Sequence, residues 1–231
     1  MIELYSWATP NGHKVHIMLE ETGLPYNVHG INIREGEQFK PEFLKVSPNN
    51  RIPAILDTDG PDGKPLSLFE SGAILMYLAS KSGMFQPLDP GERWTCVQWL
   101  MWQMGGLGPM FGQCNHFRRY SPEKIPYAID RYTNESNRLT RVLDTRLGES
   151  EYLAGKDYSI ADMAVFPWMR GADQRGVDIN EYPNARRWFD AINARPGVQR
   201  GVQILAAQHS AAPHDPKSWD IMFGKRQMAG K

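Results

Sequence analysis

Two neighbouring residues, Glu70 and Ser71, have side chains suited to binding the head group of an amino acid. They follow an apolar run at 66–68 that predicts a strand, and they precede a helix whose apolar positions begin at Ile74. The N–H groups at the start of such a helix bind anions. A carboxylate would be held there by the backbone and the Ser71 hydroxyl, and Glu70 would pair with the neighbouring ammonium group. The sequence therefore predicts a site for a small peptide with an amino-acid head.

Ile52 precedes a proline at the mouth of another predicted strand, 54–56. The cis form of an X-Pro bond costs only about 0.5–1 kcal/mol and makes a tight turn, so Pro53 is a candidate cis proline. Such a turn would leave the backbone of Ile52 facing outward. We expect it to pair there with an extended peptide, as an added strand would.

Four motifs in order resemble those of the glutathione transferase family, and most closely its bacterial Nu class. They are Thr9-Pro10-Asn11-Gly12-His13-Lys14, Ser47-Pro48-Asn49-Asn50, Leu68-Phe69-Glu70-Ser71-Gly72-Ala73-Ile74 and Gly105-Gly106-Leu107-Gly108-Pro109-Met110. The Nu class acts on disulfides with glutathione and is related to the yeast nitrogen-regulation prion protein. The resemblance spans residues 1–205. It implies an α/β thioredoxin-like domain followed by an all-α domain, with glutathione as the bound co-substrate.

The turn after the first strand carries the reactive group in thioredoxin-like domains, and here that turn is 9–12. It contains no cysteine, so the reacting sulfur would have to come from the ligand. A thiol with a pKa near 8.5 is only a few per cent ionised at pH 7. A hydrogen bond to a charged group contributes roughly 1.5–3 kcal/mol, whereas one pKa unit corresponds to about 1.4 kcal/mol. One or two donors would therefore hold the sulfur as thiolate.

The Thr9 hydroxyl and the Asn11 amide are the candidate donors, helped by the positive end of the following helix. The residue types alone favour ordinary helix capping, because Thr, Pro, Asn and Gly are typical of any strand-to-helix turn. The resemblance instead implies that this Thr and Asn lie near the sulfur, in place of the Tyr, Ser or Cys of other classes. The two roles are compatible.

The resemblance further implies which residues bind glutathione: Gln38, Arg51, Ile52, Glu70 and Ser71. Ile52 would supply the backbone pairing, Glu70 and Ser71 would bind the γ-glutamyl head, and the other two would bind the glycyl end or a second glutathione. Arg131 matches a residue that reaches into the partner subunit's site, which implies a homodimer. An exposed helix charge is an equally good interpretation of Arg131.

Composition excludes several classes of function. The 231 residues include 26 Lys and Arg against 26 Asp and Glu. This zero formal charge argues against nucleic acid as the main partner. Residues 1–5 have no signal-peptide character, and no apolar run approaches the roughly 18 residues of a membrane span. We expect a soluble cytoplasmic protein.

The cysteine and histidine spacings predict no metal site. Cys96 and Cys114, the two cysteines, are 18 positions apart in a helical region, and the six histidines form no HxH or HxxxH pair. We expect both cysteines to be small residues packed in a core.

The predicted elements describe two domains and a tail. Residues 1–86 have the order strand, helix, strand, helix, strand, strand, helix, which predicts a mixed sheet with helices on both sides. Residues 87–208 are helical. Within them, Ser159 and Asp162 have capping-box spacing, and the glycines at 105–109 should bend or open a helix. Residues 209–231 lack a clear period and predict a loose tail.

Three functions agree with these features. The first is a glutathione-dependent disulfide-bond reductase that uses no protein cysteine. A transferase that conjugates electrophiles to the same thiolate is the second, and a non-catalytic regulatory or interaction protein is the third. An acceptor pocket would come from the helical half, although the residues that would line it could equally be core: Trp102, Met110, Phe117 and Trp168.

Overall fold

The structure, a computed structural model, describes residues 1–208 and 215–228. These residues form two compact units. The first comprises Met1–Leu78 together with the described residues from Arg200 onward, and the second comprises Ala79–Gln199. The boundary therefore falls inside a helix, α3 (Ser71–Ser82), whereas the sequence analysis put it after that helix, at residue 86.

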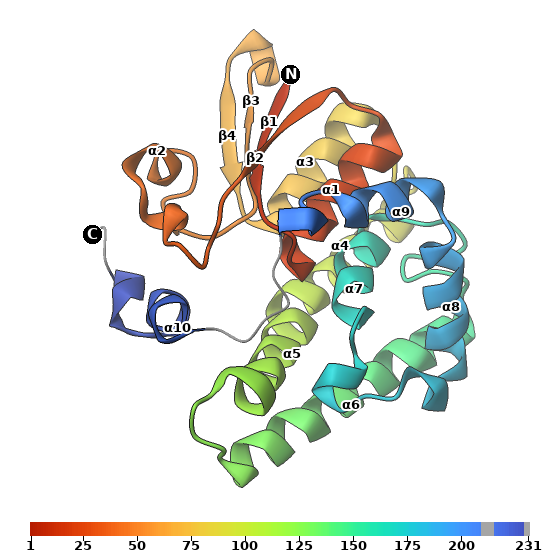
Figure 1. The fold of residues 1–231 in the computed structure, drawn as a ribbon. Helices are drawn as coiled ribbons and strands as arrows, with labels where there is room; N and C mark the ends of the chain where they lie inside the picture. Colours follow the sequence, from red (N-terminus) through yellow and green to blue (C-terminus); the bar gives the residue numbers. More distant parts are fainter. Residues whose placement is uncertain (209–214, 229–231) are drawn as a thin grey trace. The chain divides into compact units, whose positions relative to one another are not determined.

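The first unit is built on a four-stranded sheet (Figure 1). Its strands lie in the order β2-β1-β3-β4 and are β1 (Ile2–Ser6), β2 (Tyr26–Gly30), β3 (Ala54–Asp57) and β4 (Leu66–Phe69). Strands β1 and β2 are parallel, while β3 is antiparallel to both β1 and β4. The predicted thioredoxin-like mixed sheet is confirmed.

Helices cover both faces of this sheet, as predicted. Helices α1 (Pro10–Thr22) and α3 lie on one side, and the short α2 (Pro41–Leu44) lies on the other (Figure 1). Helix α1 ends at Gly23, which has a φ of +69° and closes the helix in the left-handed conformation. Two short 3₁₀ turns, Glu37–Phe39 and Pro61–Gly63, lie in the connections.

The chain returns to the first unit through α9 (Pro196–Gln203). A Cβ atom on Gly201 would lie 2.8 Å from the Cα of Ile17, so only glycine allows this close packing against α1. Nearby, the Arg200 Nε lies 2.6 Å from an oxygen of Glu20. These long-range contacts join Arg200 and Gly201 to the first unit, whereas the sequence analysis assigned residues up to 208 to the helical domain.

A further helix, α10 (Pro216–Phe223), lies in the segment that the sequence analysis expected to be a loose tail. Asp215 caps this helix: its carboxylate accepts hydrogen bonds from the N–H groups of Lys217 and Ser218. A proline occupies the first position of the helix. A 3₁₀ turn, Lys225–Met228, follows. Residues 209–214 and 229–231 of the predicted tail lie outside the described residues.

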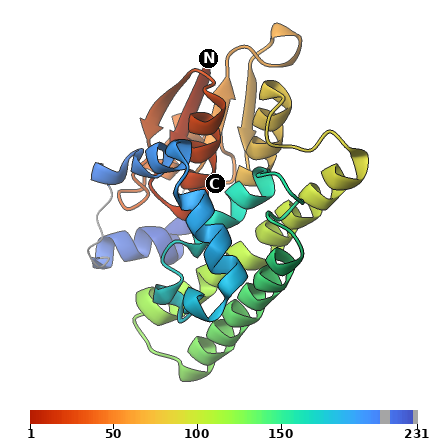
Figure 2. The ribbon, with the colours of Figure 1, turned by 90° about the vertical axis from the view of Figure 1, so that its right-hand side faces the viewer.

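The second unit is helical, as predicted. It contains α4 (Pro90–Trp102), α5 (Gly108–Asn115), α6 (Pro126–Glu149), α7 (Ile160–Met169) and α8 (Pro183–Asn193). Short 3₁₀ turns at Asp173–Arg175 and Ile179–Glu181 connect α7 to α8. Helix α7 is buried over nearly its whole length and packs against α4, α5 and α8. The longest helix, α6, runs beside α5 and α8 (Figure 2).

The predicted capping box at the start of α7 is confirmed. The Asp162 carboxylate accepts from the N–H of Ser159 at 3.0 Å, from the N–H of Leu153 at 3.0 Å and from the indole of Trp188 at 2.8 Å. All of these groups are buried. The motif therefore ties α7 to its neighbours and has a structural role.

The glycine-rich segment widens its helix and does not break it. A π-helical turn, Gln103–Leu107, joins α4 directly to α5, and a second one, His116–Tyr120, follows α5. A Cβ atom on Gly105 or Gly106 would meet no other atom within 4 Å in the described part of the chain. Close approach of another segment of this chain is therefore not the reason for glycine at these two positions. In residues 1–208 and 215–228, no helix is both long and apolar enough to cross a membrane.

Candidate functional site

The strand register brings the predicted site segments to one end of the sheet. Tyr5 of β1 is paired with Ala54 of β3, which is paired in turn with Phe69 of β4. The turn after β1, the residues before β3 and the residues after β4 therefore leave the sheet side by side. Neighbouring strands lie roughly 4.8 Å apart, so the three segments lie within about 10 Å of one another at the sheet. This span suits a short extended peptide.

Thr9 caps α1, as the sequence alone suggested. Its Oγ1 accepts a hydrogen bond from the Gly12 N–H at 3.2 Å, and Pro10 fills the first helical position. Both Thr9 and Asn11 are half-buried. A hydroxyl that accepts one bond still has a proton to donate in another direction. Capping and donation to a ligand are therefore compatible at Thr9.

The same turn requires a glycine at position 12, which the sequence analysis did not predict. A Cβ atom here would lie 2.1 Å from the carbonyl oxygen of Trp7 and 2.7 Å from the Ser6 Oγ. The Ser6 Oγ also lies 2.8 Å from the Nε2 of His16, whose pKa burial lowers to about 4. This imidazole is neutral at physiological pH and supplies no charge to the turn.

The predicted cis proline is present: the Ile52–Pro53 bond is cis. Across residues 1–208 and 215–228, the main chain of Ile52 has neither a ladder partner nor a hydrogen bond. Ile52 is half-buried. Its backbone is therefore available for the expected pairing with an extended ligand.

Glu70 and Ser71 begin α3 as predicted. The Glu70 carbonyl accepts from the N–H of Ile74 at 2.9 Å, so the N–H groups of the first helical turn point away from the helix. Glu70 has a φ of +70°, a left-handed conformation that is uncommon for a non-glycine residue. Residues held in such conformations cluster at ligand sites. The Glu70 side chain is exposed, whereas Ser71 is buried.

Lys14 lies at the same site, and the sequence analysis missed it. Its Nζ lies 3.2 Å from the Ser71 Oγ, and the side chain is only 1% exposed. Lys14 precedes Met18 by four positions, so it occupies the buried face of α1. A lysine inside an otherwise apolar stripe is the feature of the sequence that could have identified Lys14.

Gln38 and Arg51 lie in the loop between β2 and β3, and both already have partners. The Gln38 amide donates to the carbonyl of Ile33 at 3.1 Å, and its side chain is 2% exposed. The exposed Arg51 donates through Nη2 to the Oε1 of Gln227 at 2.8 Å. Gln38 therefore stabilises the loop itself, while Arg51 binds the turn that follows α10.

The remaining predicted residues belong to the second unit. Arg131 is exposed on α6, and its Nη1 lies 3.7 Å from a Glu135 carboxylate oxygen on the same helix. This ion pair agrees with the interpretation of Arg131 as an exposed helix charge. The four candidate acceptor residues are all half-buried side chains: Trp102, Met110, Phe117 and Trp168.

Neither cysteine is placed as a nucleophile. Cys96 and Cys114 are both fully buried, as predicted. Burial raises the pKa of the Cys96 thiol. The Cys114 Sγ is 3.3 Å from the carbonyl oxygen of Arg175, to which it donates. Buried, protonated thiols are poor nucleophiles.

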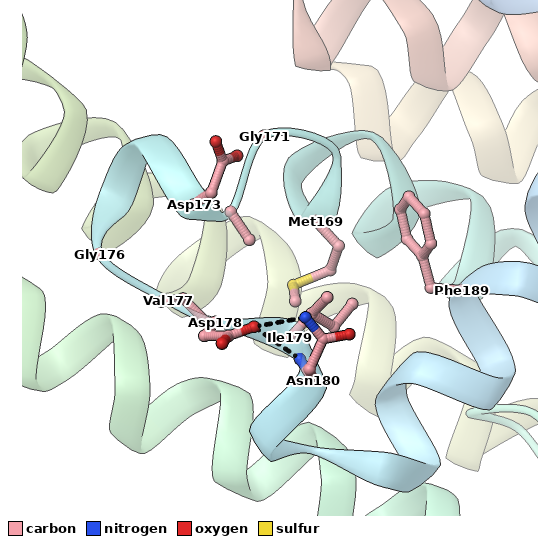
Figure 3. A pocket seen from close by; sticks show the side chains of 10 residues that line it. Met169, Gly171, Asp173, Gly176, Val177, Asp178, Ile179, Asn180 and Phe189 are labelled. Atoms are coloured by element: carbon pink, nitrogen blue, oxygen red, sulfur yellow. Dashed lines mark hydrogen bonds between the residues drawn. The ribbon is translucent and has the colours of Figure 1, made fainter.

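A hollow of about 580 Å³ lies in the second unit, near the end of α7 (Figure 3). Its charged lining residues are Asp173 and Asp178. Asp178 accepts from the backbone and side-chain nitrogens of Asn180 at 2.9 and 2.8 Å. A ligand with several carboxylates would be repelled here, so this hollow does not fit the predicted peptide. In the described part of the chain, no group of three or more metal-ligating side chains is present.

Comparison with known proteins agrees with this geometry. Residues 1–80 match the model of the glutathione S-transferase N-terminal domain, and residues 118–196 match that of the C-terminal domain. The chain is 50% identical over 209 residues to the disulfide-bond oxidoreductase YfcG of Escherichia coli strain K12, covering 90% of this chain and 96% of that protein. The chain belongs to the glutathione S-transferase family.

Solved structures of other glutathione transferases are similar over most of this chain. A Burkholderia graminis glutathione transferase with two glutathione molecules bound per subunit has a TM-score of 0.84 and 49% identity, over 87% of each chain. A Pseudomonas putida glutathione transferase with one glutathione disulfide per subunit has a TM-score of 0.83 and 47% identity, over 88% of this chain and 91% of that chain. One of these relatives is thus named for disulfide chemistry, and another has a glutathione disulfide bound.

We predict that Gly12→Ala destabilises the first unit of this glutathione S-transferase. The new methyl group would overlap the Trp7 carbonyl, and overpacking of this kind costs about 1–3 kcal/mol. Gly105→Ala is the matched control, because its methyl group meets nothing nearby. Urea unfolding measures both. Equal stability of the two variants would contradict the close approach at Gly12.

Proposed function

We propose that this family member is a glutathione-dependent disulfide-bond reductase whose reacting sulfur belongs to bound glutathione. One observation carries the proposal: a chain 50% identical to a disulfide-bond oxidoreductase has no cysteine in its first turn, and both of its cysteines are buried. The thiolate of one glutathione attacks the disulfide, forms a mixed disulfide and releases one thiol. A second glutathione attacks the mixed disulfide, releasing the other thiol and glutathione disulfide. Two glutathiones are oxidised as one disulfide is reduced.

The proposed binding mode uses the end of the sheet described above. The Ile52 backbone pairs with the cysteinyl residue of glutathione as an added strand. Ser71 and the start of α3 bind the γ-glutamyl carboxylate, and Glu70 pairs with the ammonium group. Arg51 binds the glycyl end or a second glutathione. Gln38 shapes the loop beside it, since its amide is bonded to Ile33.

Stabilisation of the thiolate is assigned to Thr9 and Asn11. The Thr9 Oγ1 accepts from Gly12, which directs the hydroxyl proton away from the helix. The positive end of α1 adds to the stabilisation of an anion there. The resemblance to the Nu class supports the same assignment. Such chemistry suits the cytoplasm, where glutathione is kept largely reduced.

A homodimer is proposed on two grounds. Arg131 matches a residue that reaches the partner subunit's site in similar proteins. In addition, Trp94 is 71% exposed and Met101 47% exposed on α4, seven positions apart and so on one face of the helix. Exposed apolar faces of this kind mark interaction surfaces.

We predict that Thr9→Ala combined with Asn11→Val raises the pKa of the bound thiol by about 1–2 units, because one or two charge-assisted hydrogen bonds are lost. The specificity constant for 2-hydroxyethyl disulfide should fall at least about tenfold at pH 7 and recover as the pH rises. The pH profile of kcat/KM measures this effect. Thr9→Ser, which keeps the hydroxyl, is the control and should behave like the natural protein.

Replacing both Cys96 and Cys114 by alanine should leave this activity unchanged. Loss of turnover in that double variant would overturn the cysteine-free mechanism. An unaltered pH profile in the double variant of Thr9 and Asn11 would show that these two residues do not stabilise the thiolate.

Conjugation of electrophiles is the second candidate function, because the same thiolate would attack an aryl halide. We predict that kcat/KM for 2-hydroxyethyl disulfide exceeds that for 1-chloro-2,4-dinitrobenzene, and steady-state kinetics on both substrates ranks the two reactions. A dominant aryl-halide rate would make conjugation the main activity. Calorimetric binding of glutathione with no turnover of either substrate would favour a regulatory protein.

We predict that sedimentation equilibrium gives a particle of twice the 26.3 kDa of one chain. In such a dimer, Arg131→Ala should weaken glutathione binding several-fold. Arg138→Ala is the matched control, since Arg138 bonds to the same Glu135 carboxylate. A monomeric particle, or equal binding by the two variants, would contradict the proposed role of Arg131.

A further inference from the structure

Arg51 is held by the protein at both its main chain and its side chain. Its carbonyl oxygen accepts a hydrogen bond from the hydroxyl of the buried Ser47 at 2.8 Å. Its Nη2 donates to the Oε1 of Gln227 at 2.8 Å, although the Arg51 side chain is exposed. A long exposed side chain normally moves among many rotamers. A partner 176 positions away in the sequence that restricts this movement needs an explanation.

Gln227 belongs to the C-terminal segment, residues 215–228, which contains α10 and the turn after it. This segment contacts both ends of the loop between β2 and β3. Near the start of the loop, the Nζ of Lys217 lies 3.3 Å from the Oε2 of Glu35. Near its end, the Asn50 Nδ2 lies 3.5 Å from the carbonyl oxygen of Gln227. The C-terminal segment therefore braces the loop from which Arg51 projects.

The partner that the C-terminal segment offers to Arg51 is neutral. Both carboxylates of the segment are bonded elsewhere: Asp215 accepts from the start of α10, and the Oδ2 of Asp220 lies 3.2 Å from the Nε of Arg226. Within residues 1–208 and 215–228, the Arg51 side chain donates to the Gln227 amide and to no other group. A guanidinium has five N–H donors, so one bond to an amide leaves four donors and the full charge for a carboxylate.

The glycyl end of glutathione should lie beside this guanidinium. Ile52 is the proposed pairing position for the cysteinyl residue, and an extended ligand places its next residue only about 3.3 Å further along. Of the two chain neighbours of Ile52, Pro53 is buried and Arg51 is exposed. Arg51 is therefore the neighbour that can bind the terminal carboxylate of the ligand.

We propose that Gln227 is a positioning residue for Arg51, through which the C-terminal segment makes the site prefer a thiol peptide with a free glycyl carboxylate. Gln227 holds the guanidinium before the carboxylate arrives, so Arg51 loses less rotamer freedom on binding. Because the Gln227 amide is neutral, it does not compete with the ligand for the charge. Gln227 acts through Arg51 and does not touch the ligand. The inference rests on the proposed glutathione site and assigns Arg51 to the glycyl end.

Calorimetry with glutathione and with γ-glutamyl-cysteinyl-glycinamide, which lacks the glycyl carboxylate, tests this role. Gln227→Met keeps the length of the side chain but removes the amide acceptor. It should bind glutathione about three- to tenfold more weakly, the effect of one hydrogen bond, and bind the glycinamide as the natural protein does. Gln227→Glu should also weaken only glutathione, because its carboxylate would compete for Arg51. Lys225→Met, a change of an exposed residue in the same turn, is the matched control.

Kinetics and thermal unfolding separate positioning from a structural role. In Gln227→Met, KM for glutathione should rise while kcat stays unchanged, since the reacting sulfur is assigned to the turn at 9–12. The melting temperature should stay that of the natural protein, because the bond to Arg51 is exposed. Equal losses of affinity for both ligands, or tighter binding of glutathione by Gln227→Met, would overturn the proposal.

Arg51→Ala distinguishes failure of this inference from failure of the proposed site. This variant should weaken the binding of glutathione but not of the glycinamide, and Gln227→Met should have no further effect in the Arg51→Ala background. If Arg51→Ala binds glutathione as the natural protein does, the proposed place of Arg51 in the site is wrong. If Arg51→Ala weakens binding while both Gln227 variants bind normally, the site stands and the role of Gln227 is rejected.

Discussion

The register of three strands is the constraint on which the candidate site depends. Tyr5, Ala54 and Phe69 are aligned across the sheet, so the chain leaves β1, enters β3 and leaves β4 at the same end. The helices that follow β1 and β4 therefore begin side by side, each with its positive end toward this edge. Between them lies the main chain of Ile52, which has no partner in the described residues. One end of the sheet thus combines two helix N-termini, which favour anions, with one main-chain segment that has no described partner.

Two hydroxyl groups at this end of the sheet each accept a hydrogen bond from within the protein. Thr9 accepts a hydrogen bond from Gly12 within its own turn, and Ser71 accepts one from the buried Lys14. A hydroxyl has a single proton, so each accepted bond directs that proton away from the donor. The Thr9 proton is therefore directed away from its own turn before a ligand arrives. This orientation agrees with glutathione as the ligand, because its sulfur must react as an anion.

Features that depend on local sequence were predicted, and those that depend on distant contacts were not. The cis bond before Pro53, the glycine that ends α1 and the capping box at Asp162 all follow from residues within four positions of each other. The return of the chain at Gly201 depends on a contact with α1, far away in sequence. Helix α10 carried a local signal, an Asp-Pro start, but it has only eight residues, too few to show a helical period within its segment. Lys14 was missed because its charge conflicts with the apolar face that it occupies.

The most direct measurement of the central claim is a titration of the thiol of bound glutathione, followed by thiolate absorbance in the ultraviolet. A variant with both cysteines replaced by alanine removes protein thiols from the signal. The account predicts that the bound thiol has a pKa at least about one unit below the value near 8.5 of a free thiol. A bound pKa at or above the free value would contradict the account, because the protein would then give the sulfur no stabilisation as an anion.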